Sequence, residues 1–246
     1  APMLKSRSNH TATLLPSGKV LLAGGASDAS AELFDPATES FAATAGLPSF
    51  VRAGGLATLL PNGKVLLAGG TDGYGGKSLE LYDPALDAFV PAGALQSATP
   101  VASLLLADGR VLFSGSRVVL NGDYAPAPSE TFDFRTTGTL PVGTSNTLHD
   151  YCSLVQAADG TVWRVGGLTP GNASAPSRVE AFDPATGQFS LGPVMLGPGR
   201  GATERVDGSI WFEGTVAAVR YGESTGMRFD PATGASEAFR GATLAA

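Results

Sequence analysis

One short phrase recurs five times along the chain, and this internal repeat constrains the fold more than any other feature. A glycine, a polar residue and a β-branched residue follow one another at Gly18-Lys19-Val20, Gly63-Lys64-Val65, Gly109-Arg110-Val111, Gly160-Thr161-Val162 and Gly208-Ser209-Ile210. The glycines are 45, 46, 51 and 48 residues apart, a period typical of propeller blades and stacked repeats. A second phrase keeps the same phase, at Asp35-Pro36, Asp83-Pro84, Asp133-Phe134, Asp183-Pro184 and Asp230-Pro231.

Each repeat is predicted to form four short antiparallel strands. In the first repeat these are residues 10–15, 19–23, 31–34 and 40–43, joined by turn sequences such as Pro16-Ser17-Gly18. The second strand is apolar without alternation, which indicates a strand covered on both faces. A four-stranded unit that must be covered on both faces fits a radial arrangement of blades. The sequence therefore predicts an all-β fold, a β-propeller of five four-stranded blades.

The first repeat resembles the kelch repeat in its bacterial form. The resemblance rests on Arg7, His10, Gly24-Gly25, Glu32 with Phe34-Asp35-Pro36, and Phe41, and it extends over nearly the whole chain. In the third and fifth repeats Ser114-Gly115 and Glu213-Gly214 replace the glycine pair. The resemblance implies a propeller related in fold to the propeller domain of galactose oxidase.

We expect a single domain over residues 1–246, with repeats at about 7–50, 51–97, 98–145, 146–196 and 197–246. The first interpretation is a monomer that closes as a five-bladed ring. Kelch propellers usually have six or seven blades, so two alternatives stay open at this point. The chain could be part of a longer repeat array, or two chains could associate.

Composition excludes several classes of function. The net charge is -6, with 16 basic and 22 acidic residues, so no basic stripe is present to bind nucleic acid. The longest apolar runs have the length of strands, which argues against a membrane span. One cysteine, Cys152, allows neither an intrachain disulfide nor a cysteine-rich metal site. The absence of an initiator methionine favours a processed or excised bacterial segment, and we expect an extracytoplasmic or secreted location.

Loop lengths indicate which end of the blades binds a partner. The loop between the second and third strands varies from residues 26–30 in the first repeat to 116–129 in the third, whereas the glycine turns hardly change. Insertions confined to one face mark the expected binding face. The links between repeats emerge on the same face and should surround the mouth of the channel. The candidate ligand-binding residues there are Arg7, His10, Arg52, His149, Tyr151 and Arg200.

The arginines of this set have two interpretations. Arg7, Arg52 and Arg200 could form a cationic mouth, because guanidinium groups bind carboxylate, sulfate or phosphate through paired hydrogen bonds. Alternatively, each arginine could tie adjacent loops together through backbone carbonyl groups, since buried polar groups often serve only to satisfy one another. The sequence leaves the two roles equally open.

The fourth link combines four chemically active residues, His149-Asp150-Tyr151-Cys152. A thiolate beside an imidazole is a recognised nucleophilic pair, and a carboxylate can orient the ring. Neighbouring residues of an extended segment point to opposite sides, however, which separates His149 from Asp150. A lone buried cysteine also commonly behaves as a small apolar residue. These four residues are therefore weak catalytic candidates.

The favoured function is a binding scaffold that recognises a protein segment, a glycan or an acidic small molecule, without a cofactor. The alternative is an enzyme of lyase, isomerase or cyclase type with acid and base groups at the channel mouth. A copper radical oxidase is a weaker alternative. Its site requires two histidines and two tyrosines, whereas this chain has only His10 and His149, three repeats apart.

Overall fold

The computed structural model describes residues 2–70, 76–96, 99–115, 117–120, 123–146, 150–168, 178–194, 199–214 and 225–240. All the regular elements in these ranges are β-strands. In chain order they are β1 Thr11–Leu14, β2 Val20–Ala23, β3 Ala31–Asp35, β4 Ser40–Ala43, β5 Leu56–Leu59, β6 Val65–Ala68, β7 Ser78–Asp83, β8 Ala88–Ala94, β9 Pro100–Leu105, β10 Val111–Gly115, β11 Arg117–Leu120, β12 Asp123–Pro126, β13 Pro128–Asp133, β14 Gly138–Thr144, β15 Asp150–Gln156, β16 Val162–Leu168, β17 Arg178–Asp183, β18 Gln188–Val194, β19 Gly199–Glu204, β20 Ile210–Gly214, β21 Thr225–Phe229 and β22 Ser236–Arg240.

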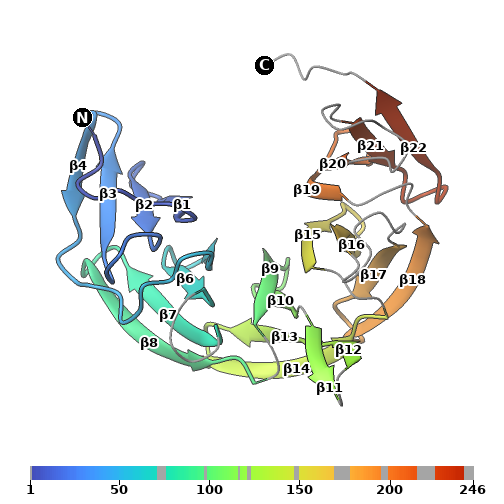
Figure 1. Cartoon of the computed structure of the whole chain (residues 1–246), viewed down its shortest axis with the longest axis horizontal. Helices are drawn as coiled ribbons and strands as arrows, with labels where there is room; N and C mark the ends of the chain where they lie inside the picture. The colour runs from blue at the N-terminus through green and yellow to red at the C-terminus, as the bar shows by residue number, and fades with distance from the viewer. Residues whose placement is uncertain are drawn as a thin grey trace. The chain divides into compact units, whose positions relative to one another are not determined.

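Five sheets contain four strands each, and each sheet is one repeat of the sequence (Figure 1). Blade 1 is β1-β2-β3-β4, blade 2 is β5-β6-β7-β8, blade 3 is β9-β10-β13-β14, blade 4 is β15-β16-β17-β18 and blade 5 is β19-β20-β21-β22. Neighbouring strands of the sheets are antiparallel, as in β1–β2, β2–β3 and β3–β4. The predicted fold class is therefore confirmed.

The recurring glycine forms the turn between the first two strands of each blade. In blade 1 the Leu15 amide donates to the Lys19 carbonyl at 2.8 Å, and the Gly18 amide donates back to Leu15 at 2.9 Å. Gly18 has a φ of +84°, a conformation that costs little only for glycine. The same pair of bonds recurs around Gly63, Gly109, Gly160 and Gly208, which explains why this phrase is the strongest signal in the sequence.

The chain forms two compact units. The first unit contains residues 1–113 and 130–140, and the second contains 114–129 and 141–246. In the first unit, Leu21 and Ala23 of blade 1 pack against Val65, Leu67 and Tyr82 of blade 2. The opposite face of blade 2 packs against blade 3 in a cluster that contains Leu66, Ala68, Val111, Phe113 and Phe132.

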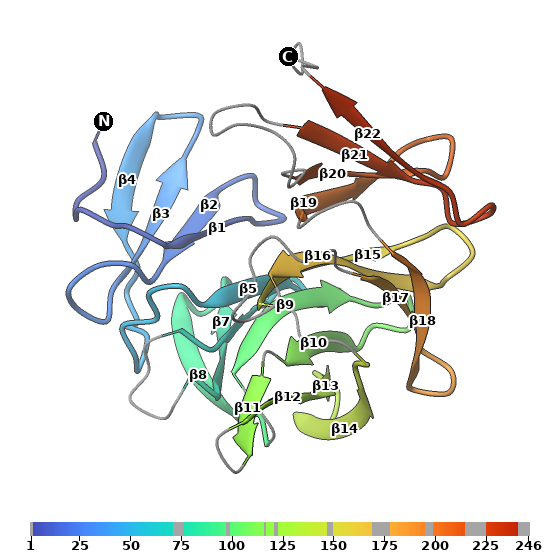
Figure 2. The same cartoon turned by 45° about the vertical axis from the view of Figure 1, so that its right-hand side comes forward.

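In the second unit, blades 4 and 5 pack face to face. Val165 and Val179 of blade 4 cluster with Ile210, Met227 and Phe229 of blade 5. The Trp163 ring meets the Phe229 ring edge to face, with the centroids 4.9 Å apart. Strands β15 and β19 lie side by side (Figure 2). In the first unit, strand β6 of blade 2 is thus covered on both faces, by blade 1 on one side and blade 3 on the other, as its unbroken apolar sequence predicts.

One further sheet lies outside the blades. Strands β11 and β12 form a two-stranded antiparallel hairpin in the segment between β10 and β13. Its register pairs Arg117 with Pro126 and Leu120 with Asp123. The two residues that join the strands in the sequence are Asn121-Gly122, a strong signal for a tight hairpin turn. In Figure 1 the hairpin is labelled at β11 and β12.

No helix in the described ranges has the length and hydropathy that a membrane-spanning helix needs.

Candidate functional site

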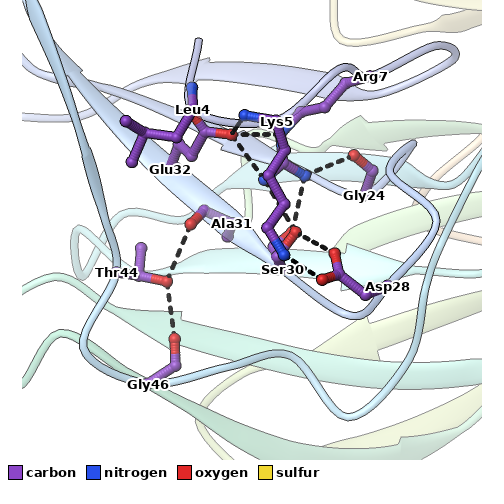
Figure 3. A network of polar contacts seen from close by, with 10 residues as sticks. All are labelled: Leu4, Lys5, Arg7, Gly24, Asp28, Ser30, Ala31, Glu32, Thr44 and Gly46. Carbon is purple, nitrogen blue, oxygen red and sulfur yellow. Dashed lines mark hydrogen bonds and ion pairs between the residues drawn. The ribbon is translucent and has the colours of Figure 1, made fainter.

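Arg7, the first of the predicted mouth residues, is buried in an ion pair (Figure 3). Its Nε donates to the Glu32 carboxylate at 2.9 Å, and its Nη2 lies 2.9 Å from the same group. Its Nη1 donates to the carbonyls of Gly24 and Ser30 at 2.9 and 2.8 Å. The Arg7 side chain is 0% exposed. The guanidinium group is therefore occupied by the protein itself.

Arg52 repeats this arrangement in blade 2. Its Nε donates to Glu80 at 2.9 Å, and its Nη1 donates to the carbonyls of Gly69 and Ser78 at 3.0 and 3.1 Å. The Arg52 side chain is 3% exposed, and its guanidinium lies 5.3 Å from the centroid of the Phe50 ring. These contacts match the loop-tying role that the sequence left open for Arg7 and Arg52.

The glutamate partners also hold the links that lead into the blades. Glu32 accepts hydrogen bonds from the Leu4 and Lys5 amides at 2.7 and 3.1 Å. Glu80 accepts one from Ser49 at 2.8 Å, and Glu130 accepts one from Gln96 at 2.9 Å. Glu180 accepts one from the Asn146 amide. Four buried glutamates at equivalent positions thus hold the links that lead into blades 1 to 4. Sequence reasoning did not assign these glutamates to the site, although in blades 1 to 4 they recur two residues before the aromatic residue that precedes the turn aspartate.

A second ion pair extends the blade 1 network toward the surface (Figure 3). The Lys5 ammonium group contacts Asp28, and the Ser30 hydroxyl donates to the same carboxylate at 2.7 Å. These hydrogen bonds, first from Lys5 and then from Ser30, hold the pKa of Asp28 below its ordinary value. Ser30 also accepts a hydrogen bond from Arg7 at 3.0 Å, so Arg7, Ser30 and Asp28 form one continuous polar chain.

The glycine pair of blade 1 lets two links pass close to the end of strand β2. Gly24 and Gly25 have φ values of +76° and +72°. A Cβ atom on Gly24 would lie 2.4 Å from the Arg52 carbonyl oxygen, and one on Gly25 would lie 2.4 Å from that of Ser8. The backbone of Arg52 and the guanidinium of Arg7 therefore meet at the same turn, which only glycine can occupy without strain.

Blade 4 contains a buried arginine that sequence reasoning missed. Arg164 lies in β16, at the position of Leu22, Leu67 and Phe113 in blades 1 to 3. Its Nη1 donates to Glu180 at 2.7 Å and its Nε to the Cys152 Sγ at 3.4 Å. The Ser114 Oγ is 3.7 Å from the same sulfur. The exception was visible in the sequence as a charge inside an otherwise apolar strand.

Burial shapes the electrostatics of this cluster. The Arg164 side chain and the Glu180 side chain are both 0% exposed. Burial disfavours the charge of the Arg164 guanidinium, but the Cys152 thiol and the Glu180 carboxylate outweigh it, and its pKa is raised. The arginine therefore stays charged and neutralises Glu180 inside the sheet. The arrangement is the blade 4 counterpart of the Arg7–Glu32 pair, with the cation supplied by a strand instead of a link.

The other predicted residues are only partly described. His10 is half-buried, and its Nδ1 has no hydrogen-bond partner among the described residues. Asp150 and Tyr151 are described only as members of strand β15, and Arg200 only as a member of β19. His149 lies outside the described residues. A shared site for His149, Asp150, Tyr151 and Arg200 remains a prediction, while Cys152 is 6% exposed and contacts Arg164.

Comparison with known proteins gives a match in structure alone. No family model and no curated protein sequence matches this chain. A solved structure described as a novel fungal alcohol oxidase with catalytic diversity among the AA5 family, in complex with copper, is similar to it with a TM-score of 0.68. The sequence identity is 19%, over 89% of this chain and 51% of the oxidase. The chain has a β-propeller fold. It spans about half the length of that oxidase, and the likeness extends to the fold alone.

A copper site would need several ligand side chains gathered in one place. No group of three or more His, Cys, Asp or Glu residues in the described ranges could hold a metal ion. The buried Tyr82 hydroxyl, which could serve as a ligand, instead donates to Asp87 at 2.8 Å. Of the two histidines in the sequence, His10 lies within the described residues and His149 lies outside them.

Proposed function

We propose that this propeller is a non-enzymatic recognition module that binds an extended segment of a protein partner. Arg7 and Arg52 support this over an acidic small molecule, because Glu32 and Glu80 already occupy their guanidinium groups. A rigid framework with variable loops on one face is suited to recognition. The kelch resemblance favours the same role by analogy of fold.

The observation that carries the proposal is the β11–β12 hairpin. It belongs to none of the four-stranded blades, and among the described strands each of its two strands pairs only with the other. A hairpin of this kind presents unpaired backbone amide and carbonyl groups along its outer edges. An extended peptide can add a further strand to such an edge, gaining affinity from main-chain hydrogen bonds.

The sequence favours β11 over β12 as the receiving edge. Strand β11 reads Arg-Val-Val-Leu, whereas β12 ends in Pro126, which has no amide hydrogen to donate. A two-residue turn makes Leu120 and Asp123 a hydrogen-bonded pair, so Val119 belongs to a pair without such bonds. The backbone groups of Val119 therefore face the free edge. The partner is expected to be an extended and mainly apolar segment.

The test is a selection of binding segments from a random peptide display library. Selected peptides are titrated against the wild-type chain, the Val119→Pro variant and the Val119→Ile control. Loss of the outward amide in Val119→Pro should weaken binding at least about 10-fold, with Val119→Ile close to wild type. Equal binding to Val119→Pro would exclude the β11 edge as the site. Selection of glycans or small anions in parallel arrays, with no peptide, would exclude a protein partner.

Oxidation of alcohols is the competing hypothesis, because the similar solved structure is a copper alcohol oxidase. Two measurements separate the hypotheses: equilibrium dialysis against Cu²⁺, and hydrogen peroxide release when primary alcohols are offered to the copper-treated protein. The recognition module predicts neither saturable copper binding in a 1:1 ratio nor peroxide release. Peroxide release that is lost in both His10→Ala and His149→Ala would replace the proposal by the oxidase hypothesis.

A further inference from the structure

The turn between strands β5 and β6 contains an asparagine followed by a glycine, Asn62-Gly63. Asn62 is exposed in this turn. Asparagine loses its side-chain amide most readily before glycine, because a following side chain would hinder the approach of the backbone nitrogen to the carboxamide. The chain contains five asparagines, and glycine follows only Asn62 and Asn121. Of these two, Asn62 lies within the described residues.

The turn folds the Asn62 carboxamide back over the backbone of Gly63. The Asn62 Oδ1 accepts a hydrogen bond from the Lys64 amide at 3.1 Å, which is the turn that asparagine side chains commonly make with their own backbone. This bond uses the carboxamide oxygen, so the Nδ2 group points away from the Lys64 amide. Nδ2 is the group that must leave when the amide is lost.

The native turn slows this reaction without preventing it. The Gly63 amide donates to the Leu60 carbonyl at 2.9 Å, and its nitrogen must release that bond and lose its proton before it can attack. Exposed turns open locally at a much lower free energy than core strands, and a single hydrogen bond opposes opening only modestly. We therefore expect a reaction that is slower than in the unfolded chain but measurable.

Three other blades show that the fold accommodates the product. Aspartate stands at the position of Asn62 in blades 3, 4 and 5. Each of these carboxylates accepts a hydrogen bond from the amide two residues later, at 2.9, 2.9 and 3.0 Å for Asp108, Asp159 and Asp207. The backbone bonds of the turn are the same in all of these blades. An aspartate at position 62 can therefore keep the geometry that Asn62 has.

Lys64 supplies a cation next to the carboxylate that the reaction creates. Its ammonium group lies 2.8 Å from Asp83, and its side chain is 38% exposed. In blade 3 the residue equivalent to Lys64 is Arg110, which donates through Nε to the Asp108 carboxylate at 2.8 Å. A carboxylate at position 62 can pair with Lys64 in the same way, and such a surface pair offsets the cost of the added charge.

We propose that Asn62 is a site of spontaneous covalent modification, at which the carboxamide becomes a carboxylate. The Gly63 nitrogen forms a bond to the Asn62 Cγ, the Cγ–Nδ2 bond breaks, and Nδ2 leaves as ammonia with the proton that Gly63 gives up. Water then opens the cyclic imide. Attack at Cγ gives aspartate, whereas attack at the main-chain carbonyl carbon gives isoaspartate, which adds a methylene group to the backbone of the turn. The reaction does not depend on the proposed peptide site.

Peptide mapping by mass spectrometry tests the proposal on the intact chain, incubated for days in mildly alkaline buffer. Asn62 should lose its amide before Asn9 and Asn146, which precede residues with side chains. Its rate should lie within about 100-fold of the rate in the urea-denatured chain, and it should fall in mildly acidic buffer, where the Gly63 nitrogen keeps its proton. The matched control is Asn62→Gln, which keeps a carboxamide on a longer side chain and should show no loss at this position.

Retention of the Asn62 amide in the folded chain, over the interval in which the denatured chain loses it, would overturn the proposal, because the Leu60–Gly63 bond would then keep the turn closed. Equal rates at Asn62 and Asn9 would overturn it as well. Asn62→Asp tests the accommodation of the product separately. Its urea midpoint should be equal to or above that of wild type at neutral pH, and a clearly lower midpoint would contradict the comparison with blades 3 to 5.

Discussion

At the scale of single residues, the main feature is a set of arginines buried with glutamates. Transfer of a charged group from water into a sheet costs several kcal/mol unless a partner and further hydrogen bonds compensate it. Arg7, Arg52 and Arg164 meet this condition with Glu32, Glu80 and Glu180. The partners of these arginines could not be predicted from the sequence. Arg7 and Glu32, for example, are 25 residues apart, and nothing in this spacing indicates an ion pair.

The repeats themselves provide the substitutions for a double-mutant cycle on Arg164 and Glu180. Blade 5 has Phe212 and Met227 at these positions. Arg164→Phe alone should cost about 3–5 kcal/mol of unfolding free energy, because Glu180 remains as a buried, uncompensated charge. Glu180→Met alone should be comparably costly. The double variant should cost at least about 2 kcal/mol less than the sum of the single variants.

Urea unfolding at neutral pH measures all four corners of this cycle. Additive costs would mean that the two side chains stabilise the blade independently, contrary to the ion-pair account. Cys152→Ala is a useful companion variant, because it removes the sulfur contact of Arg164 and leaves Glu180 in place. Its cost should be small beside that of Arg164→Phe, since a thiol is a weak acceptor.

At the scale of elements, the turns between third and fourth strands contain a strained position. Glu39, Asp87 and Thr137 have φ values of +51°, +48° and +51°, where blades 4 and 5 have Gly187 and Gly234. A left-handed conformation costs a residue with a Cβ atom about 1–2 kcal/mol. Blades 1 to 3 therefore carry backbone strain at this position, whereas the glycines of blades 4 and 5 avoid it. The sequence did not reveal this, because the turn tolerates both kinds of residue.

Thr137→Gly should stabilise the protein by about 0.5–1 kcal/mol, because Thr137 is exposed, β-branched and in this conformation. Asp87→Gly at the equivalent position of blade 2 should have the opposite sign. Asp87 accepts hydrogen bonds from the Ala45 amide at 2.9 Å and the Tyr82 hydroxyl at 2.8 Å, and their loss should cost about 1–3 kcal/mol. Denaturant midpoints of the two variants would contradict this account if they moved in the same direction.

The element boundaries were largely predictable, whereas the hairpin was not. Strands of the first repeat were expected at residues 10–15, 19–23, 31–34 and 40–43, and β1 to β4 begin and end within one residue of these limits. Tight turns and an apolar strand covered on both faces leave little freedom in that register. The sequence analysis treated residues 116–129 only as a long loop, because the short apolar run of β11 did not indicate that it would pair with β12 outside the blade.

At the scale of the whole molecule, five aspartates in equivalent turns couple stability to pH. They are Asp35, Asp83, Asp133, Asp183 and Asp230, and the pKa of each carboxyl is held below its ordinary value. The largest cause is a hydrogen bond donated to the carboxylate in each case. The donor is a backbone amide for Asp35 and Asp183, the Lys64 side chain for Asp83, the Arg135 side chain for Asp133 and the Thr233 side chain for Asp230.

The sign of the pH dependence follows from these directions. A pKa that is lower in the folded than in the unfolded state favours the folded protein above the unfolded pKa of about 4. That contribution is lost as the pH falls through the folded pKa values. Wild-type stability should therefore be steady between about pH 7 and pH 5 and should fall below about pH 4.

Asp183→Asn isolates one of the five turns. It should lower the urea midpoint at neutral pH, where the carboxylate is charged, and the gap to wild type should narrow as the pH falls below about 4. Glu237→Gln is the control, since Glu237 is an exposed carboxylate on β22 outside the turns. A gap between Asp183→Asn and wild type that stays constant from neutral to acidic pH would contradict the assigned role of the carboxylate.

The repeat made the whole-molecule fold class predictable, whereas the role of the polar residues in the links between blades was not. Periodicity sets the number of strands per unit, and each unit then forms from local contacts. The polar residues of the links depend instead on contacts between segments far apart in the sequence. Arg7 could bind an anion or a buried carboxylate with the same geometry, so only the structure separates these roles.

Each buried arginine–glutamate pair that holds a link, here called a tie, lies within one repeat, and this affects how such chains evolve. Glu32 holds the link that leads into its own blade, through Leu4, Lys5 and Arg7, and Glu80 does the same through Ser49 and Arg52. Both partners of a tie are therefore inherited together when a gene segment for one such unit is duplicated. A new copy needs no compensating mutation in the neighbouring repeats to bury its charges. Unequal recombination can thus lengthen or shorten the array by whole blades without leaving an unpaired ion inside the protein.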